Sequence, residues 1–312
     1  MRKILVTAIG GNVANGILKI LVKGNDEIYG CDINDFPVGI DKVKVFWKSD
    51  LAVSPDYIPN LLNKCLYYGI THIIPVNESE INVISNNIDL FAINNIKLIM
   101  QNKSVLDICL DKLTTMRYLS KFINENIPRT FTFNEFVENN ETYVVKLRNS
   151  CGSKFLKYIS TRDELEDLPH SNEEYIVQEY LENNDEEYTI GLFADKEEIN
   201  TIIFKRKLHD GYTNFVELVQ IDEIEVLAKN IANIFNLRGY INIQLRKKNG
   251  KYKIFEINPR ISGTVYFRHM LGFDDVIWWI NLVDGIENPK YVQKYNEAIG
   301  MRELTEKFIV IK

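Results

Sequence analysis

The residues best suited to chemistry lie in the stretch IFEINPRISGT, residues 254–264. Read at the two-residue period of a β-strand, the stretch turns two apolar side chains, Phe255 and Ile257, toward one face. Three polar side chains share the opposite face: Glu256, Asn258 and Arg260. The apolar face predicts contact with a core, and the polar face predicts a row of groups that can meet a ligand.

This polar row combines groups that bind a metal ion with a group that binds phosphate. Glu256 and Asn258 offer a carboxylate and an amide oxygen, which are hard donors that suit Mg²⁺. Arg260 suits phosphate oxygens, because its guanidinium can donate two parallel hydrogen bonds. Pro259 lacks a backbone donor, so we expect the strand to end there. An amphipathic strand that merely leaves these side chains in solvent is the alternative interpretation.

The preceding stretch YINIQLR, residues 240–246, alternates apolar and polar residues in the same way. The link between the two stretches contains Asn249 and Gly250, a pair that is typical of a β-hairpin turn. We therefore expect the two strands to pair, and the length of the turn decides which residues face each other.

The register can be chosen by requiring each face of the hairpin to be consistent. A two-residue turn would set Glu256 opposite Ile243, which mixes polar and apolar side chains on one face. A three-residue loop over residues 248–250 sets Glu256 opposite Asn242 and places Gln244 diagonally to it. We therefore predict the three-residue loop, and Gln244 as a further oxygen donor beside the metal.

The composition is that of a globular protein, and 312 residues suffice for about two domains with their own cores. A net charge of −6 argues against broad binding to nucleic acid or to an anionic membrane. The first residues read as a strand and not as a signal peptide, and no apolar run is long enough to span a membrane. The four cysteines form no CxxC pair, which is typical of reduced thiols in a cytoplasmic protein.

Residues 1–100 alternate strand and helix patterns, which predicts a doubly wound, mostly parallel α/β unit. The predicted strands are 3–8, 27–32, 71–76 and 96–100, and the predicted helices are 13–22, 56–68 and 81–91. Ligands of such units bind beyond the carboxyl ends of the strands. Those ends carry residues 10–12, 32–35 and 77–80, where we expect a substrate to bind.

Gly10 and Gly11, with Asp32 about 20 residues further on, suggest a dinucleotide-binding turn as a competing interpretation. However, the stretch GGNVANG lacks the G-x-G-x-x-G spacing of such turns. Substrate binding is therefore preferred over an NAD site, and a plain glycine turn is the third interpretation.

Two lysines in the middle of the chain stand where they could meet a phosphate. Residues 101–125 read as helical, and Lys112 opens the second helix of this segment. The next strand ends at Lys146 and is followed by a small polar loop that contains Gly152 and Ser153. Backbone N–H groups of such a loop can cover phosphate oxygens, although a plain hairpin loop explains the same residues.

Further predicted elements also end in polar groups. A strand over residues 175–181 ends in Glu179, Tyr180 and Leu181. The next strand begins near Glu187, and a strand over residues 202–208 carries a cationic end: Lys205, Arg206 and Lys207. Residues 222–235 read as a helix packed on the core. A helix bearing Arg268 is expected after residues 254–264, and a final strand is expected in residues 301–311.

In this order the motifs resemble those of the ATP-grasp superfamily of carboxylate ligases, over roughly residues 104–312. Within it, the chain is most similar to the branch of carbamoyl-phosphate-synthase-like amino-acid and amide ligases. The resemblance implies a Rossmann-like domain (1–103), a small lobe with a glycine loop (104–180) and a large lobe with the metal site (181–312). Two departures are Cys151 in the glycine loop and Gln244, where the family often has an acidic residue.

The resemblance also implies a role for each motif. ATP would be bound by Lys112, Lys146, Gly152, Ser153, Glu179, Tyr180, Leu181 and Glu187. In this set the lysines contact phosphate, backbone groups of residues 179–181 meet adenine, and Glu187 binds the ribose. One or two Mg²⁺ ions, or Mn²⁺ in their place, would be held by Glu256, Asn258 and Gln244. Arg260 would lie beside the transferred phosphate.

Two further cations complete the implied catalytic set. Lys205 is available to stabilise charge on the moving phosphoryl group, and Arg268 would face the acceptor substrate. A surface arginine paired with Asp274 or Asp275 is the alternative interpretation of Arg268.

The implied function is ATP-dependent joining of a small-molecule carboxylate to an amine, or less often a thiol, through an acyl phosphate. ADP and phosphate are the expected products, and neither nucleic acid nor a membrane is an expected partner; a homodimer is the assembly considered. Two other functions stay open: nucleotide binding without catalysis, and NAD-dependent oxidoreduction. The retained metal-binding row argues against the first, and the second leaves the C-terminal half unexplained.

Overall fold

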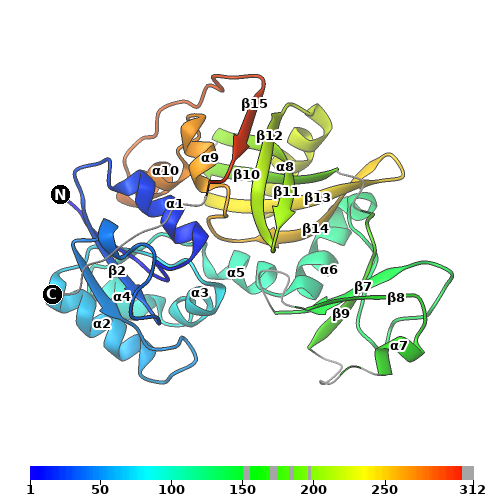
Figure 1. Ribbon diagram of the computed structural model, residues 1–312, viewed down its shortest axis with the longest axis horizontal. Coiled ribbons are helices and arrows are strands. Elements are labelled where there is room, and N and C mark those ends of the chain that lie inside the picture. Colours follow the sequence, from blue (N-terminus) through cyan, green and yellow to red (C-terminus); the bar gives the residue numbers. More distant parts are fainter. Residues whose placement is uncertain (150–154, 167, 169–173, 183–185, 196–197, 304–312) are drawn as a thin grey trace.

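The computed structural model describes residues 1–149, 155–166, 168, 174–182, 186–195 and 198–303. In this part of the chain, helices pack on three β-sheets (Figure 1). One sheet is parallel and two are antiparallel, so the predicted combination of α/β and α+β architecture is confirmed. None of the described helices has the length and apolar content needed to cross a lipid bilayer.

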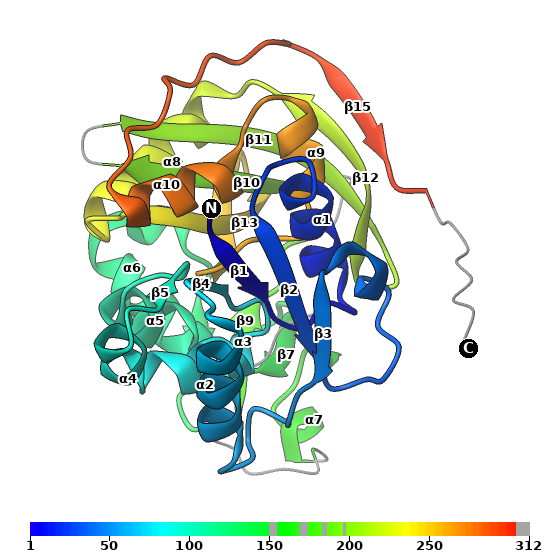
Figure 2. The same cartoon turned by 90° about the vertical axis from the view of Figure 1, so that its left-hand side faces the viewer.

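The N-terminal sheet is the predicted doubly wound unit (Figure 2). Its strands lie in the order β3 (Val45–Lys48), β2 (Glu27–Asp32), β1 (Lys3–Val6), β4 (His72–Ile74) and β5 (Lys97–Leu98). Its helices are α1 (Asn12–Leu21), α2 (Tyr57–Tyr68), α3 (Glu78–Ser85) and α4 (Ile88–Ile93). Two details differ from the prediction. Edge strand β3 was not expected, and the single helix over residues 81–91 is in fact two, the first starting early because Asn77 and Glu80 form a capping box.

A small antiparallel sheet lies on the side of the molecule away from the N-terminal sheet (Figure 1). Its strands lie in the order β6 (Thr130–Phe131), β9 (Tyr175–Glu179), β7 (Tyr143–Leu147) and β8 (Leu156–Ile159), and α7 (Asp163–Glu166) follows β8. This sheet has an aromatic-rich core of its own, which includes Phe133, Phe136, Tyr143 and Tyr175.

The large antiparallel sheet carries helices on both faces. Its strands lie in the order β14 (Lys251–Asn258), β13 (Gly239–Lys248), β10 (Glu187–Asp195), β11 (Glu198–His209), β12 (Tyr212–Val219) and β15 (Ala298–Met301). One face packs against α5 (Lys103–Cys109), α6 (Lys112–Ile123) and α8 (Asp222–Ile234), and the other against α9 (Val265–Met270) and α10 (Asp275–Asp284). The last described strand, β15, ends where the predicted final strand over residues 301–311 begins, and most of that prediction, residues 304–312, lies outside the described residues. The predicted domain boundaries stay predictions.

The turn between β13 and β14 corrects a prediction. It is a two-residue turn in which Asn249 and Gly250 both have positive φ, 52° and 78°, so the three-residue loop was wrong. A β-bulge then inserts one extra residue into β14, which shifts the pairing and places Glu256 opposite Gln244 instead of Asn242.

The same bulge changes which side chains enter the core. Ile254 and Ile257 are buried among the residues of the large sheet, whereas Phe255 lines the cleft described below together with Glu256. The prediction that Phe255 shares the core face with Ile257 was therefore wrong. The prediction did not consider a bulge. The extra residue of the bulge, and not a longer turn, brings Glu256 onto the same face as Gln244 and Asn258.

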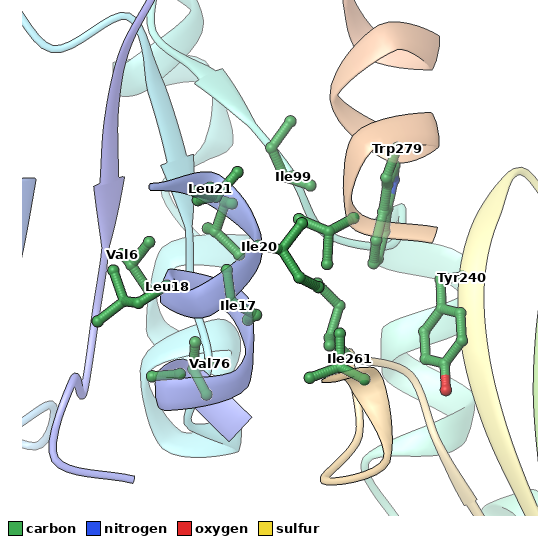
Figure 3. Packing of buried hydrophobic residues seen from close by; sticks show 14 of the residues in the cluster. Val6, Ile17, Leu18, Ile20, Leu21, Val76, Ile99, Tyr240, Ile261 and Trp279 are labelled. Carbon is green, nitrogen blue, oxygen red and sulfur yellow. The ribbon is translucent and has the colours of Figure 1, made fainter. Parts of the chain in front are cut away.

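The N-terminal sheet and the large sheet share one hydrophobic core (Figure 3). Val6 of β1 lies in the same cluster as Tyr240 of β13 and Trp279 of α10. Gly16 of α1 lies so close to α9 that a Cβ atom there would be 2.5 Å from Cγ1 of Val265. This shared core fixes the ends of the N-terminal strands against the polar row of β14.

Candidate active site

A cleft between the small sheet and the large sheet gathers most residues predicted to bind nucleotide. We call it the nucleotide cleft; its polar lining includes Lys112, Lys146, Glu179, Tyr180, Glu187, Gln244 and Glu256. Its apolar lining includes Val144, Phe155, Leu156, Leu181 and Leu208. The empty volume of the cleft, counted together with the space that opens to solvent, is about 760 Å³.

Lys146 lies on β7 of the small sheet, and its side chain extends across the cleft to the bulge of β14. Its Nζ donates a hydrogen bond to the backbone oxygen of Phe255 at 3.0 Å. Burial lowers the pKa of Lys146 to about 7; Glu256 opposes this effect, and the positive charges of Lys112 and Arg246 add to it. A phosphate group bound nearby would supply the negative charge that favours the protonated lysine.

Residues 179–181 carry the chain from the small sheet toward the large one. The carboxylate of Glu179 pairs with Lys248 at 2.9 Å and with Lys253 at 3.2 Å. The backbone N–H of Leu181 donates to no described residue. That donor fits the predicted contact with adenine, because a ring nitrogen can accept it.

Glu187, at the start of β10, is held between two arginines of the large sheet. Arg206 reaches one carboxylate oxygen at 2.6 Å and Arg246 reaches the other at 2.6 Å. Burial acts to raise the pKa of Glu187, but the two guanidinium groups outweigh it and hold that pKa below its ordinary value. Arg246 also donates to the carbonyl oxygen of Leu181 at 2.8 Å, so this ion-pair cluster ties residues 179–181 to the sheet.

The three predicted metal ligands lie on one face of the β13–β14 hairpin. Gln244 pairs directly with Glu256, and Asn258 follows two residues later on the same face. The half-buried carboxylate of Glu256 makes no hydrogen bond or ion pair with a described residue. The side-chain oxygens of Gln244 and Asn258 accept from Arg206 at 2.9 Å and from Arg260 at 3.3 Å.

One open carboxylate flanked by two amide oxygens is a donor set that fits Mg²⁺. The described residues contain no cluster of three His, Cys, Asp or Glu side chains that could hold a metal. A site here would therefore depend on its amide oxygens as well as on Glu256.

A second pocket opens beside the same row of residues. Its lining includes residues from the N-terminal strand ends and from the large sheet: Gly11, Asn12, Asn77, Glu78, Arg206, Gln244, Glu256, Asn258, Arg260, Gly263 and Arg302. The nucleotide cleft and the second pocket share Leu208 and three polar residues, Arg206, Gln244 and Glu256. Strand ends 10–12 and 77–80 thus contribute Gly11, Asn12, Asn77 and Glu78 to this pocket. Substrate binding there stays a prediction.

The third strand end has a different role. Asp32 is buried, and its carboxylate accepts hydrogen bonds from the backbone N–H groups of Gly10 at 2.8 Å and Asn34 at 2.9 Å. The carboxylate therefore holds the first turn in place, which favours the glycine-turn interpretation over an NAD site.

Arg260 of the predicted catalytic set lies in the second pocket and bonds to the N-terminal unit. Its Nε donates to the carboxylate of Glu78, at the start of α3, at 2.9 Å. Both side chains are mostly buried, at 15% and 16% exposure. The N-terminal unit therefore helps to aim an arginine that stands beside Asn258 and Glu256.

Lys205 does not face the site, so its predicted role was wrong. Successive residues of a strand point to opposite faces, and on β11 it is Arg206 that lies beside Glu187. Arg206 lines both pockets, and Lys205 is absent from the described lining of either one. Reading residues 202–208 at strand period would have separated the two cations.

Arg268 is a structural residue and does not face a substrate. It is 0% exposed, and its Nη2 pairs with Asp275 at 2.6 Å. Its Nη1 donates to the hydroxyl groups of Ser262 and Thr264 at 2.8 Å and 2.6 Å. The predicted substrate-holding role was wrong, because α9 turns this side chain into the core against Tyr240. The pairing with Asp275 is confirmed, but at a buried location instead of the surface.

Other predictions stand differently. Gly152 and Ser153 lie outside the described residues, so their contact with phosphate stays a prediction. Arg206, Arg246 and Arg302 were not predicted for the site, and Glu78 was predicted only as part of the strand end 77–80. Arg246 shares the polar face of residues 240–246 with Gln244, and that alternation was the available signal.

Comparison with known proteins points to one superfamily. Residues 171–307 match a family model described as ATP-grasp in the biosynthetic pathway with Ter operon. A tyramine–L-glutamate ligase from Methanocaldococcus fervens is 23% identical over 212 residues, which cover 66% of this chain and 62% of that protein. A tyramine–L-glutamate ligase from Methanocaldococcus jannaschii is 27% identical over 130 residues, 40% of this chain and 37% of that protein. The chain thus spans less than two thirds of the length of these curated relatives.

Solved structures agree on the fold. N5-carboxyaminoimidazole synthetase from Staphylococcus aureus, in complex with ADP, has a TM-score of 0.75 at 15% identity and covers 97% of this chain and 82% of its own. L-amino acid ligase from Bacillus licheniformis has a TM-score of 0.71 at 14% identity and covers 91% and 74%. Residues 171–307 thus match an ATP-grasp family model, and nearly the whole chain shares the fold of these solved structures.

Proposed function

We propose that the protein is an ATP-dependent ligase that joins a small carboxylic acid to an amine. The observation that carries this proposal is the junction of the two pockets at Arg206, Gln244 and Glu256. A nucleotide on one side of that row and an acid on the other would bring a terminal phosphate and a carboxylate together. Phosphoryl transfer asks a protein mainly for positioning and for balancing charge, and this junction offers both.

In the first step a carboxylate oxygen of the acid would form a bond to the terminal phosphorus of ATP. The bond from that phosphorus to the bridging oxygen would break, which leaves ADP and an acyl phosphate. Lys146 and Lys112 line the nucleotide cleft, Arg260 lines the second pocket and Arg206 lines both. These cations would balance the charge of the phosphates and of the acid. Mg²⁺ bound by Glu256, Asn258 and Gln244 would supply charge neutralisation and orientation of the phosphates.

In the second step the amine nitrogen would attack the acyl carbon, and phosphate would leave with the electron pair of the broken carbon–oxygen bond. The amine would lose a proton to phosphate or water, so no protein nucleophile is required. The relatives named tyramine–L-glutamate ligase make L-glutamate and tyramine the first acid and amine to test.

We also infer a cytoplasmic location, because Cys31, Cys65 and Cys109 are free and buried. Reduced thiols of this kind are typical of that compartment. A homodimer stays a prediction, which light scattering on the purified protein would test.

The experiment is ADP release with Mg·ATP, screened over pools of carboxylic acids and amines. We expect ADP and phosphate only when an acid and an amine are both present, and mass spectrometry should find the amide. Stoichiometric AMP and pyrophosphate would contradict the acyl-phosphate route. Tight ATP binding without ADP in any pool would instead indicate a nucleotide-binding protein without turnover.

A further inference from the structure

The second pocket contains an arginine that none of the motifs accounts for. Arg302 directly follows β15, and its backbone N–H donates to the carbonyl oxygen of Asn214 in β12 at 2.9 Å. Gly300 lets this strand lie tightly over α9, because a Cβ atom there would be 2.8 Å from the ring of Phe267. The Arg302 guanidinium then stacks 5.6 Å from the centre of that ring and points into the pocket.

This guanidinium differs from the other arginines of the pocket in its partners. Arg206 pairs with Glu187 and Arg260 pairs with Glu78. Among the described residues, the Arg302 guanidinium donates only to backbone carbonyl oxygens, from Nε to Thr213 at 3.1 Å and from Nη2 to Gly263 at 2.8 Å. No described carboxylate pairs with it, and its Nη1 donates to no described residue.

A half-buried positive charge without an acidic partner is unfavourable unless a ligand completes it. Burial lowers the pKa of Arg302, yet an arginine stays charged at neutral pH. Two carbonyl oxygens orient the planar group and leave Nη1 free, which suits a carboxylate that arrives from the pocket.

We propose that Arg302 binds a second carboxylate of the acid substrate, so that the substrate class is dicarboxylic acids, dicarboxylic amino acids included. This inference rests on the proposed ligase function. The geometry follows from Thr213, whose carbonyl oxygen accepts from Arg302 and whose hydroxyl oxygen accepts from Arg206 at 3.4 Å. One carboxylate of the substrate would react at the junction beside Arg206. The other carboxylate would be held by Arg302, which bonds to the same threonine as Arg206.

The test compares binding of succinate, glutarate and adipate with binding of butyrate, by calorimetry in the presence of Mg·ADP. We expect wild type to prefer at least one dicarboxylate over butyrate by about tenfold to a hundredfold. Arg302→Met should remove this preference, and Arg302→Lys should keep part of it as a point charge. Arg238→Met is the matched control, since that arginine is 61% exposed and lies outside the second pocket; it should keep the full preference.

Three outcomes would overturn the inference: no preference for any dicarboxylate in wild type, no binding of any of them, or an unchanged preference in Arg302→Met. A purely structural role would weaken all four acids equally and lower the unfolding temperature. ADP release separates this inference from the ligase proposal. If ADP forms only with monocarboxylic acids, the role of Arg302 is wrong and the ligase proposal stands. If dicarboxylates are preferred through Arg302 but no acid gives ADP, the role of Arg302 stands and the ligase proposal is wrong.

Discussion

The nucleotide cleft and the second pocket share a row of residues but balance their charges differently. In the cleft, Glu187 is held by two basic side chains and Glu179 by three. In the second pocket, Arg302 stacks on Phe267, and its guanidinium donates to carbonyl oxygens alone among the described residues. Between the two, the carboxylate of Glu256 makes no hydrogen bond or ion pair with a described residue.

This difference separates residues that hold the site together from residues that wait for a ligand. An ion pair within the protein fixes both side chains before anything binds, whereas an unpaired charge gains its partner only from the ligand. We therefore expect the paired residues to contribute mainly to geometry. Glu256 and Arg302 should contribute mainly to binding and turnover.

The largest effect is expected from Glu256→Gln, which removes the anionic oxygen shared by both pockets. We expect ADP release to fall by about 10²-fold or more, the scale found when one preorganised electrostatic group is lost. The unfolding temperature should change little, because no described residue bonds to this carboxylate. Near-normal ADP release in this variant would mean that the metal site lies elsewhere.

The next effect compares two neighbouring cations on opposite faces of β11. Arg206→Met should lower kcat/KM for both ATP and the acid by roughly tenfold to a hundredfold, because Arg206 lines both pockets. Lys205→Met, the matched control, should stay within about twofold of wild type, since its side chain points to the other face. Equal losses in both variants would contradict the register of β11.

A pH effect is expected on the nucleotide side alone. Lys146 has a pKa of about 7, and phosphate binding favours its protonated form, so ATP affinity should be constant below pH 7 and fall above it. The fall should approach about tenfold per pH unit. The nucleotide titrates in the same way whether it binds wild type or Lys146→Met. The ratio of the two ATP affinities therefore removes that contribution and leaves the titration of the lysine. A ratio that does not change between pH 6 and pH 8 would show that Lys146 does not titrate there.

The smallest of these effects concerns the acid side. Glu78→Gln removes the ion pair that holds Arg260 and should raise the KM for the acid about fivefold, the scale of a partly buried ion pair of about 1 kcal/mol. The KM for ATP should stay constant, because Glu78 does not line the nucleotide cleft. Glu135→Gln serves as a control, since it alters an exposed ion pair with Arg117. An increase in the KM for ATP alone would reverse the assignment of the two pockets.

The sequence was informative where local alternation alone decides which way a side chain points. The row of Glu256 and Asn258 and the start of β10 at Glu187 follow from strand period and from the order of the motifs. Lys112 and Lys146 were likewise found in the nucleotide cleft. These residues depend on their own strand or helix and little on distant parts of the chain.

The remaining features depend on contacts that sequence spacing does not contain. Arg260 meets Glu78 across 182 positions of sequence. Arg302 enters the second pocket only because β15 pairs with β12. Arg268 fits the pattern of a site residue, yet its burial with Asp275 depends on how α9 packs against the large sheet. The bulge at Phe255 was missed because two turn lengths were compared and an extra strand residue was not.

The close approach of Gly16 to Val265 also predicts that these two distant positions change together in evolution. A side chain at position 16 would lie 2.5 Å from Cγ1 of Val265, so in related proteins of this fold a larger residue at the first position should accompany a smaller one at the second. The pair can be tested in one background. Gly16→Ala alone should lower the unfolding free energy by about 1–3 kcal/mol, although alanine is normally the better helix former.

Adding Val265→Ala to Gly16→Ala should then destabilise the protein less than it does in wild type. Thermal unfolding of the wild type, the two single variants and the double variant measures this coupling. Additive effects would mean that the two positions vary independently, and that the N-terminal unit can be exchanged between relatives without adjusting the helix on which it rests.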